Sequence, residues 1–353
     1  MTNDANKNVA GTMSSEATAS EGSSVAKVTL SEKYERAIEA FIERDDCRFI
    51  VDTSSDFDPA LRKRLGIQLV SFAYVTPEGE RLDDLWESQT PHEFYEYLRE
   101  NPTVHYSTSA ITPGRYLEAF EEAAKEGKPA IFLSLPSTLS TSFNNAERAA
   151  EMLRETYPDF ELYVIDSLCE SAAIELLVLE AIYQMSEGLS PKETVAWIEE
   201  ARHSLRGYFM LDNLDSLAAG GRIPPKAAQL GSMLDIKPSL TYEDDGKLTL
   251  RGAHRGRRKA LRAVLQDFRD TYDQDTSRLM AIVSTDSDAD GDWLEQQVRK
   301  IDGLEDVVIL RNSVSSVLGS HVGPDMVGFT FWATDRREKA SLADRLAKKV
   351  RGA

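Results

Sequence analysis

Short runs of serine and threonine follow several apolar segments of the sequence, and their side chains are the first candidates for chemistry. The runs occur at residues 52–55, 107–109, 134–142 and 166–167. Hydroxyl groups donate hydrogen bonds without carrying charge, so several of them beside helix N-termini suit a small anion such as a carboxylate. A phosphate site would favour glycines and a lysine, and no Gly-x-x-x-x-Gly-Lys segment occurs. Each run alone is typical of a cap or a turn, but four such clusters together favour a binding site.

Two charged side chains in the second half of the sequence are candidates for the same site. Arg222 follows the flexible pair Gly220-Gly221. His321 lies between Gly319 and Gly323, in a segment that we expect to be a loop. Glycine and proline around a polar residue usually indicate a tight turn, but a side chain held in this way can also be directed at a ligand.

The elements that must position these residues alternate between short apolar strands and capped helices. Apolar residues at helical spacing predict a helix over residues 31–45, and Thr90-Pro91-His92-Glu93 is typical of a helix start. Strands are predicted at residues 48–52, 67–75, 129–135 and 161–165. This alternation predicts a parallel sheet with helices on both faces. Ligands of such sheets bind beyond the carboxyl ends of the strands, where three of the hydroxyl runs lie.

The pattern changes near residue 207, which indicates a second unit. Asp244-Asp245-Gly246 lies between two strand-like segments and predicts a hairpin. Further strands near residues 279–284, 306–311 and 327–333 are separated by predicted helices. We therefore predict two α/β domains, residues 29–206 with the parallel sheet and residues 207–353 with a mixed sheet. Residues 1–28 are too polar to form a core and are predicted to be a disordered tail.

Composition excludes several classes of protein. The formal net charge of −18 argues against a nucleic-acid-binding protein, which normally carries a basic surface. The sequence has no run of 18 apolar residues that would span a membrane, and its start does not resemble a signal peptide. Cys47 and Cys169 are the only cysteines, and we expect free thiols in a reducing cytoplasm. The acidic residues are spread along helix faces, so we expect no metal site.

Several segments, in this order, resemble the DegV family of fatty-acid-binding proteins. The similar segments are Phe49-Ile50-Val51-Asp52-Thr53-Ser54-Ser55-Asp56, Ser107-Thr108-Ser109, Ser137-Thr138-Leu139-Ser140-Thr141-Ser142-Phe143, Asp166-Ser167, Leu211-Asp212-Asn213-Leu214, Gly220-Gly221-Arg222-Ile223, Leu234-Asp235-Ile236-Lys237-Pro238, Gly256-Arg257-Arg258-Lys259-Ala260 and Gly319-Ser320-His321-Val322-Gly323-Pro324. The similarity runs from about residue 47 to about residue 333. The sequence departs from the family pattern at Thr138 and Thr141, where glycines are usual, and at Ala110-Ile111, where Gln-Pro is usual.

This resemblance implies both a fold and a role. It implies two α/β domains with one long-chain fatty acid between them, and no cofactor, metal or catalytic residue. It also implies the binding subunit of a bacterial fatty acid kinase, which presents the carboxylate to a separate kinase subunit for acyl phosphate formation. Thr108 and Ser140 match the positions that bind the carboxylate, and Arg222 and His321 match polar residues close to it. Ser109 and Ser137 are further carboxylate-binding positions by the same comparison.

Other functions compete with this interpretation. In a serine hydrolase acting on an acyl ester, Ser140 would be the nucleophile, His321 its base, and Asp52 or Asp166 would orient the histidine. No Gly-x-Ser-x-Gly segment occurs around any serine, which argues against that enzyme. A kinase that acts alone would need a phosphate-binding loop, and this sequence has none, which argues against that function. A regulatory binder of another small carboxylic acid remains an alternative.

Overall fold

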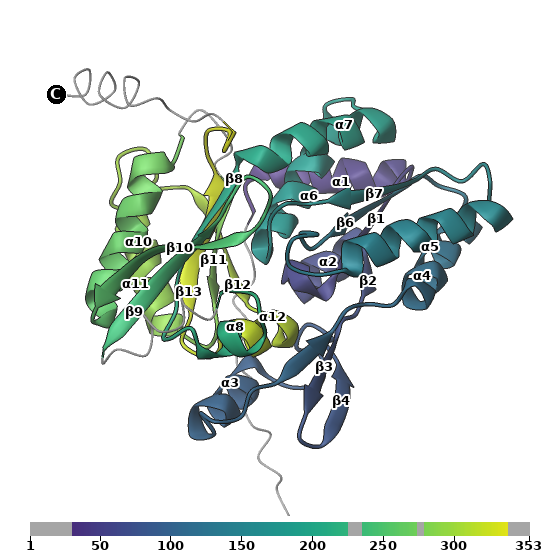
Figure 1. The fold of residues 1–353 in the computed structure, drawn as a ribbon. Helices are drawn as coiled ribbons and strands as arrows, with labels where there is room; N and C mark the ends of the chain where they lie inside the picture. Colours follow the sequence, from purple (N-terminus) through teal and green to yellow (C-terminus); the bar gives the residue numbers. More distant parts are fainter. Residues whose placement is uncertain (1–29, 225–234, 274–278, 338–353) are drawn as a thin grey trace, which may run out of the picture.

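The computed structural model describes residues 30–224, 235–273 and 279–337 of the chain. Two α/β units lie side by side, with a smaller sheet and helix below them in the view of Figure 1. The predicted tail at residues 1–28 lies outside the described residues. Among the described residues, no helix is long and apolar enough to cross a membrane. Cys47 and Cys169 are buried free thiols, as predicted.

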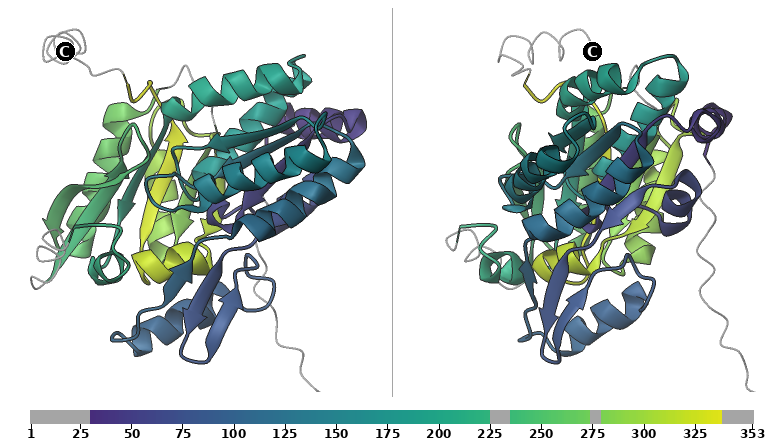
Figure 2. Two further views of the ribbon diagram at one scale, coloured as in Figure 1. Left: turned by 45° about the vertical axis from the view of Figure 1, so that its right-hand side comes forward. Right: turned by 90° about the vertical axis from the view of Figure 1, so that its right-hand side faces the viewer.

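The N-terminal unit is built on a four-stranded parallel sheet, which confirms the predicted architecture. Its strands, in the order β2-β1-β6-β7, are Gln68–Val70, Arg48–Asp52, Ala130–Ser134 and Leu162–Asp166. Helices cover both faces (Figures 1 and 2). They are α1 (Glu32–Arg44), α2 (Pro59–Leu65), α4 (Pro113–Glu126), α5 (Ser142–Thr156), α6 (Ala172–Ser186) and α7 (Pro191–Ala201).

Helix α6 lies at the centre of the molecule. It packs against α1 and α7 and also contacts strands β8, β11 and β13 of the second sheet. Its sequence, AAIELLVLEAIYQMS, is apolar around almost the whole circumference, which is typical of a helix buried on all sides. The two units therefore share one continuous apolar core across α6.

The C-terminal unit is built on a six-stranded mixed sheet, again as predicted. Its strands, in the order β10-β9-β8-β13-β11-β12, are Leu248–Arg255, Ile236–Tyr242, Leu205–Met210, Val327–Trp332, Leu279–Ser284 and Val308–Ser313. Only the pair β11–β12 is parallel in this sheet. Helices α10 (Arg257–Thr271) and α11 (Asp288–Val298) pack on one face in a separate apolar cluster. Two short helices, α8 (Asp215–Ala219) and α12 (Ser316–Val322), lie near the junction with the N-terminal unit.

The single strand predicted over residues 67–75 is wrong. The chain leaves the parallel sheet after β2, and a separate antiparallel sheet begins at β3 (Ala73–Thr76) with β4 (Gly79–Leu82) and β5 (Ser107–Ser109). The amide of Phe72 donates to the hydroxyl of Thr53 at 3.1 Å instead of continuing the ladder. Because most of the segment is apolar, with only Gln68 and Ser71 polar, its sequence does not mark the position of this break. Helix α3 (Pro91–Glu100), which starts with the predicted capping box at Thr90, belongs to the same small region.

Buried carboxylates join the two units at the turn between β12 and α12. Asp56 accepts a hydrogen bond from the Ser315 amide at 2.7 Å, and Asp83 accepts one from the Val317 amide at 2.9 Å. The side chain of Asn312 donates to Glu175 at 2.6 Å. These bonds fix α12 against the N-terminal unit, so they also fix the position of His321 on that helix.

Candidate ligand-binding site

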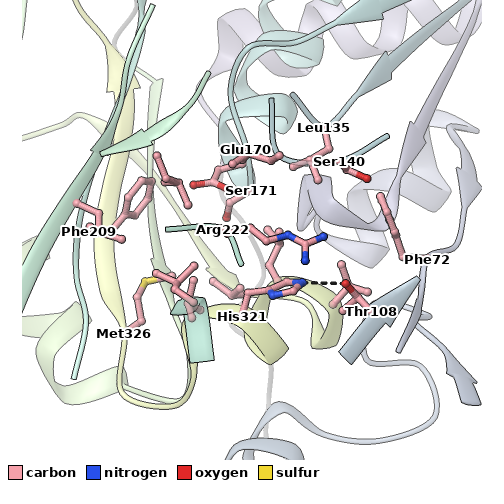
Figure 3. A pocket seen from close by; sticks show the side chains of 18 of the residues that line it. Phe72, Thr108, Leu135, Ser140, Glu170, Ser171, Phe209, Arg222, His321 and Met326 are labelled. Atoms are coloured by element: carbon pink, nitrogen blue, oxygen red, sulfur yellow. Dashed lines mark hydrogen bonds between the residues drawn. The ribbon is translucent and has the colours of Figure 1, made fainter. Parts of the chain in front are cut away.

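An apolar cavity lies between the two units (Figure 3). It encloses about 780 Å³ of space between atoms, including its opening to solvent. Its apolar walls come from both units and from α12. They are formed by Phe72, Ala110, Leu135, Leu139, Phe209, Leu211, Leu217, Leu240, Leu248, Val314, Val317, Leu318, Val322 and Met326. A cavity that is mostly apolar and has a few polar groups at defined places is typical of a small-molecule site.

Four of the six predicted site residues meet in this cavity. Thr108, Ser140, Arg222 and His321 all line it, and Figure 3 shows them on the side of the cavity away from Phe209. The hydroxyl oxygen of Thr108 lies 2.8 Å from Nε2 of His321, although the two residues are 213 positions apart in sequence.

The other two predicted residues, Ser109 and Ser137, do not line the cavity. In β5, successive side chains point to opposite faces, so Thr108 is directed inward while Ser109 is exposed on the outer face. Ser137 is exposed in the turn after β6, where its amide donates to Asp166 at 3.2 Å. The structure therefore separates the six residues into an inner group of four and an outer pair.

His321 lies in a helix, so its predicted position in a loop is wrong. The glycines on either side of His321 do not form a loop: one allows close helix packing and the other ends the helix. A side chain at Gly319 would come within 2.2 Å of the Tyr95 hydroxyl, so glycine lets α12 approach α3 closely. Gly323 has φ +73° and ends the helix. On the other side, a Cβ at Gly220 would lie 2.4 Å from Nδ1 of His321, so the chain before Arg222 also needs a glycine.

The imidazole of His321 has unused hydrogen-bonding capacity. Its Nδ1 is buried and has no hydrogen-bond partner among the described residues. Burial, with a smaller contribution from the nearby positive charge of Arg222, lowers the pKa of His321 to about 4. The ring is therefore neutral at neutral pH, and it can bind a ligand as a dipole without adding a second positive charge.

Arg222 supplies the positive charge of the cavity. Its guanidinium donates to the carbonyl oxygen of Gly220 at 2.5 Å, and no carboxylate pairs with it among the residues that the structure describes. Burial lowers the pKa of Arg222, but an arginine retains its charge at physiological pH. An unpaired guanidinium in an apolar cavity favours an anionic ligand.

Ser140 lies immediately before the N-terminus of α5. Its hydroxyl donates to the hydroxyl of Ser142 at 2.9 Å and accepts from the Ser142 amide at 3.2 Å. The side chain of the N-cap residue, Thr141, makes no capping hydrogen bond. The positive end of a 15-residue helix therefore lies beside the cavity, where it favours an anion.

The contacts of Ser140 and His321 do not form a nucleophile and base pair. Ser140 bonds to Ser142, whereas the only described partner of the His321 ring is Thr108. Asp52 accepts from the amides of Ser54 and Leu135, and Asp166 accepts from backbone amides of the turns that follow β6 and β7. Neither acid contacts His321, so the geometry does not support the hydrolase hypothesis.

Glu170 and Ser171 also line the cavity, and the sequence interpretation missed both. Ser171 donates to Asp56 at 2.5 Å and so belongs to the carboxylate junction as well. The feature of the sequence that could have indicated Glu170 is its position as an acidic residue in the otherwise mostly apolar segment after Asp166-Ser167. That signal was ambiguous, because a single acid at the start of a helix is usually a surface residue.

Comparisons with known proteins agree on one family. The family model described as "Uncharacterised protein, DegV family" matches residues 47–334. A DegV domain-containing protein of Clostridium perfringens is 32% identical over 278 residues, which are 78% of this chain and 94% of that protein.

Solved structures give the same result for the fold. A structure described as fatty acid binding of a DegV family protein from Thermus thermophilus is 28% identical, with a TM-score of 0.71 over 82% of this chain and 99% of that one. The Streptococcus pneumoniae Fatty Acid Kinase (Fak) B3 protein, loaded with linoleic acid, has a TM-score of 0.69 over 81% of this chain and 99% of that one. At 19% identity, this second likeness concerns the fold alone.

Proposed function

This chain belongs to the DegV family, and we propose that it binds one long-chain fatty acid between its two units. The acyl chain occupies the apolar cavity, and the carboxylate lies among Thr108, Ser140, Arg222 and His321. One observation carries this proposal: the cavity is apolar over most of its wall and has an unpaired guanidinium, with neutral donors beside it, on one side. The fatty acid bound by the Thermus thermophilus relative supports the same ligand class.

The energetics of such a ligand are consistent with stable binding. Each buried methylene contributes about 0.8 kcal/mol, so a chain of about 16 carbons contributes on the order of 10 kcal/mol before ordering costs. The carboxylate loses its hydration on entering the cavity, and this loss must be compensated by protein groups. Arg222 compensates the negative charge, and the hydroxyls of Thr108 and Ser140 fix the orientation of the head group.

We further propose that the protein is a carrier without catalytic activity of its own. It would work in the cytoplasm and present the carboxylate to a separate kinase subunit that forms acyl phosphate. The shared fold with the Fatty Acid Kinase B3 protein supports this role. Ser140 and His321 would then serve as binding groups, which agrees with the absence of a hydrogen bond between them among the described contacts.

Mass spectrometry of the purified full chain under native conditions tests the binding proposal. We expect one fatty acid per chain, retained through purification or taken up after delipidation. Folded protein that yields no fatty acid and takes up none would contradict it. For the carrier role, we expect no acyl phosphate from protein, ATP and fatty acid until a kinase subunit is added. Turnover by the chain alone would contradict that part only.

A further inference from the structure

Glu170 places a carboxyl group in the apolar wall of the cavity. The residue lies between β7 and α6, next to Ser171, and both side chains line the cavity. Figure 3 shows the carboxyl of Glu170 directed away from Thr108, towards the side of the cavity where Phe209 lies. It is therefore separate from the group that we assign to the fatty acid carboxylate.

Among the described residues, the Glu170 side chain has no hydrogen bond and no ion pair. The two other charged or titratable groups of the cavity wall, Arg222 and His321, contact Gly220 and Thr108 instead. Burial alone raises the pKa of Glu170 to about 7. Near neutral pH the group is thus partly protonated, and it can donate one hydrogen bond as well as accept others.

A carboxyl group in an apolar cavity makes unfavourable contact with an unsubstituted hydrocarbon chain. A methylene beside it satisfies none of its hydrogen-bonding capacity, and the group loses the water that otherwise hydrates it. An alcohol both donates and accepts, so a hydroxyl on the acyl chain would satisfy the carboxyl in either protonation state. A site built to bind a hydroxyl rejects the analogue that lacks it, because a buried polar group is then left unpaired.

We propose that Glu170 is a specificity-determining residue that recognises a hydroxyl group along the acyl chain, so that the preferred ligands are hydroxylated long-chain fatty acids. This inference rests on the proposed function and refines its substrate class. Thr108, Ser140, Arg222 and His321 hold the carboxylate at one place, and Glu170 contacts the chain at a second. The distance between these two places then selects the position of the hydroxyl along the chain.

Binding of palmitic acid and of its positional hydroxy isomers to the delipidated full chain tests this inference. Competition measured by native mass spectrometry gives the affinity ratio of each isomer to palmitic acid. For the wild type we expect at least one mid-chain isomer to bind roughly tenfold more tightly than palmitic acid, as for a hydrogen bond to an ionisable group. Isomers whose hydroxyl lies far from that position should bind no more tightly than palmitic acid.

Two substitutions at Glu170 sharpen the test. Glu170→Leu should abolish the preference and bind palmitic acid more tightly than the wild type does. Glu170→Gln, which keeps donor and acceptor groups, should retain part of the preference, and the exposed Glu187→Gln is its matched control. If Glu170→Leu does not fold, the positional series in the wild type and Glu170→Gln still decide the question.

The possible outcomes separate this inference from the proposed function. If palmitic acid binds and the wild type prefers no hydroxylated isomer, the role of Glu170 is refuted and the carrier function stands. The same conclusion follows if Glu170→Leu leaves every affinity ratio unchanged. If neither palmitic acid nor any isomer binds to the folded wild type, the proposed function itself is refuted.

Discussion

Two polar regions of this molecule, the buried junction and the cavity wall, lie close together and differ in how completely their charged groups are paired. At the junction between the units, both oxygens of Asp52, Asp56, Asp83 and Glu175 accept hydrogen bonds, mostly from backbone amides. In the cavity wall, Arg222 bonds only to a backbone carbonyl, Nδ1 of His321 has no partner, and Glu170 has none among the described residues.

The difference distinguishes a structural region from a binding region. A buried charge without a partner costs stability, so the paired carboxylates belong to the folded framework, although Asn312 Oδ1 and Ser315 Oγ are buried there without a partner among the described residues. In the cavity wall the unpaired groups are charged or titratable and line open space, where a ligand can complete the set. Charge follows the same division. Burial raises the pKa of Asp56 and of Glu175 to about 8 and that of Asp52 and of Asp83 to about 6. Part of the negative charge of the junction is therefore removed at neutral pH, while the cavity keeps the positive charge of Arg222.

The largest expected effect is on stability, at the junction. Asp56→Ala leaves the Ser315 amide and the Ser171 hydroxyl without their acceptor, and we expect a loss of about 2–4 kcal/mol in the free energy of unfolding. Asp56→Asn keeps the shape and the acceptor, so its cost should stay below about 1 kcal/mol. Urea denaturation measures both, with the exposed Asp159→Ala as control. Equal costs for Ala and Asn would show that pairing does not explain the junction.

The next effect is on binding, at the cavity. Arg222→Met keeps the aliphatic stem but removes the charge, and we expect fatty acid affinity to fall by about a hundredfold, the upper end for a bond to a charged group. Stability should change little, because the guanidinium makes a single described hydrogen bond. Isothermal titration with palmitic acid and a melting curve test the two halves. A large stability loss with intact binding would reverse the roles that we assign to the two regions.

The hydroxyls of the cavity should follow with a smaller effect. Ser140→Ala should weaken fatty acid binding by roughly tenfold or somewhat more, and Ser140→Thr should cost less because it keeps the hydroxyl. His321→Ala should combine non-additively with Ser140→Ala, since both contact one small anion. Ser109→Ala is the matched control, because Ser109 lies on the exposed face of the same strand as Thr108. An effect of Ser109→Ala as large as that of Ser140→Ala would contradict the inward and outward assignment.

The last prediction concerns the dependence of stability on pH, an effect that is spread over several pH units. Asp56 and Glu175 rise from ordinary values of 3.8 and 4.5 to about 8 in the folded protein. Between these limits the folded state binds more protons than the unfolded state, so the free energy of unfolding should fall as the pH rises from about 5 to about 8. Asp56→Asn, which does not titrate, should flatten this slope in a series of denaturation curves. A wild-type stability that rises over the same interval would contradict the assignment.

Local sequence signals were sufficient for most elements of the fold. The capping box at Thr90 starts α3 as predicted, and one at Ser190 starts α7 in the same way, because the hydrogen bonds of a capping box involve only residues three positions apart. Apolar spacing predicted α1. The hydroxyl runs after β1, β6 and β7 were correctly placed at strand ends, because the alternation of strands and helices decides where each strand stops.

What the sequence could not decide depends on which residues meet across long separations. The apolar segment 67–75 looks like one strand, and only packing against Thr53 divides it between two sheets. Thr108 and Ser109 are equivalent by type, and the pairing of β5 with β3 alone directs one inward and the other outward. The contact of Thr108 with His321 and the exposure of Glu170 to an apolar cavity exist only after α12 and α6 dock. Residue types and spacing thus determined the elements and the kinds of group available for binding. Tertiary packing determined which of those groups remain unpaired, because pairing is a property of neighbours in space.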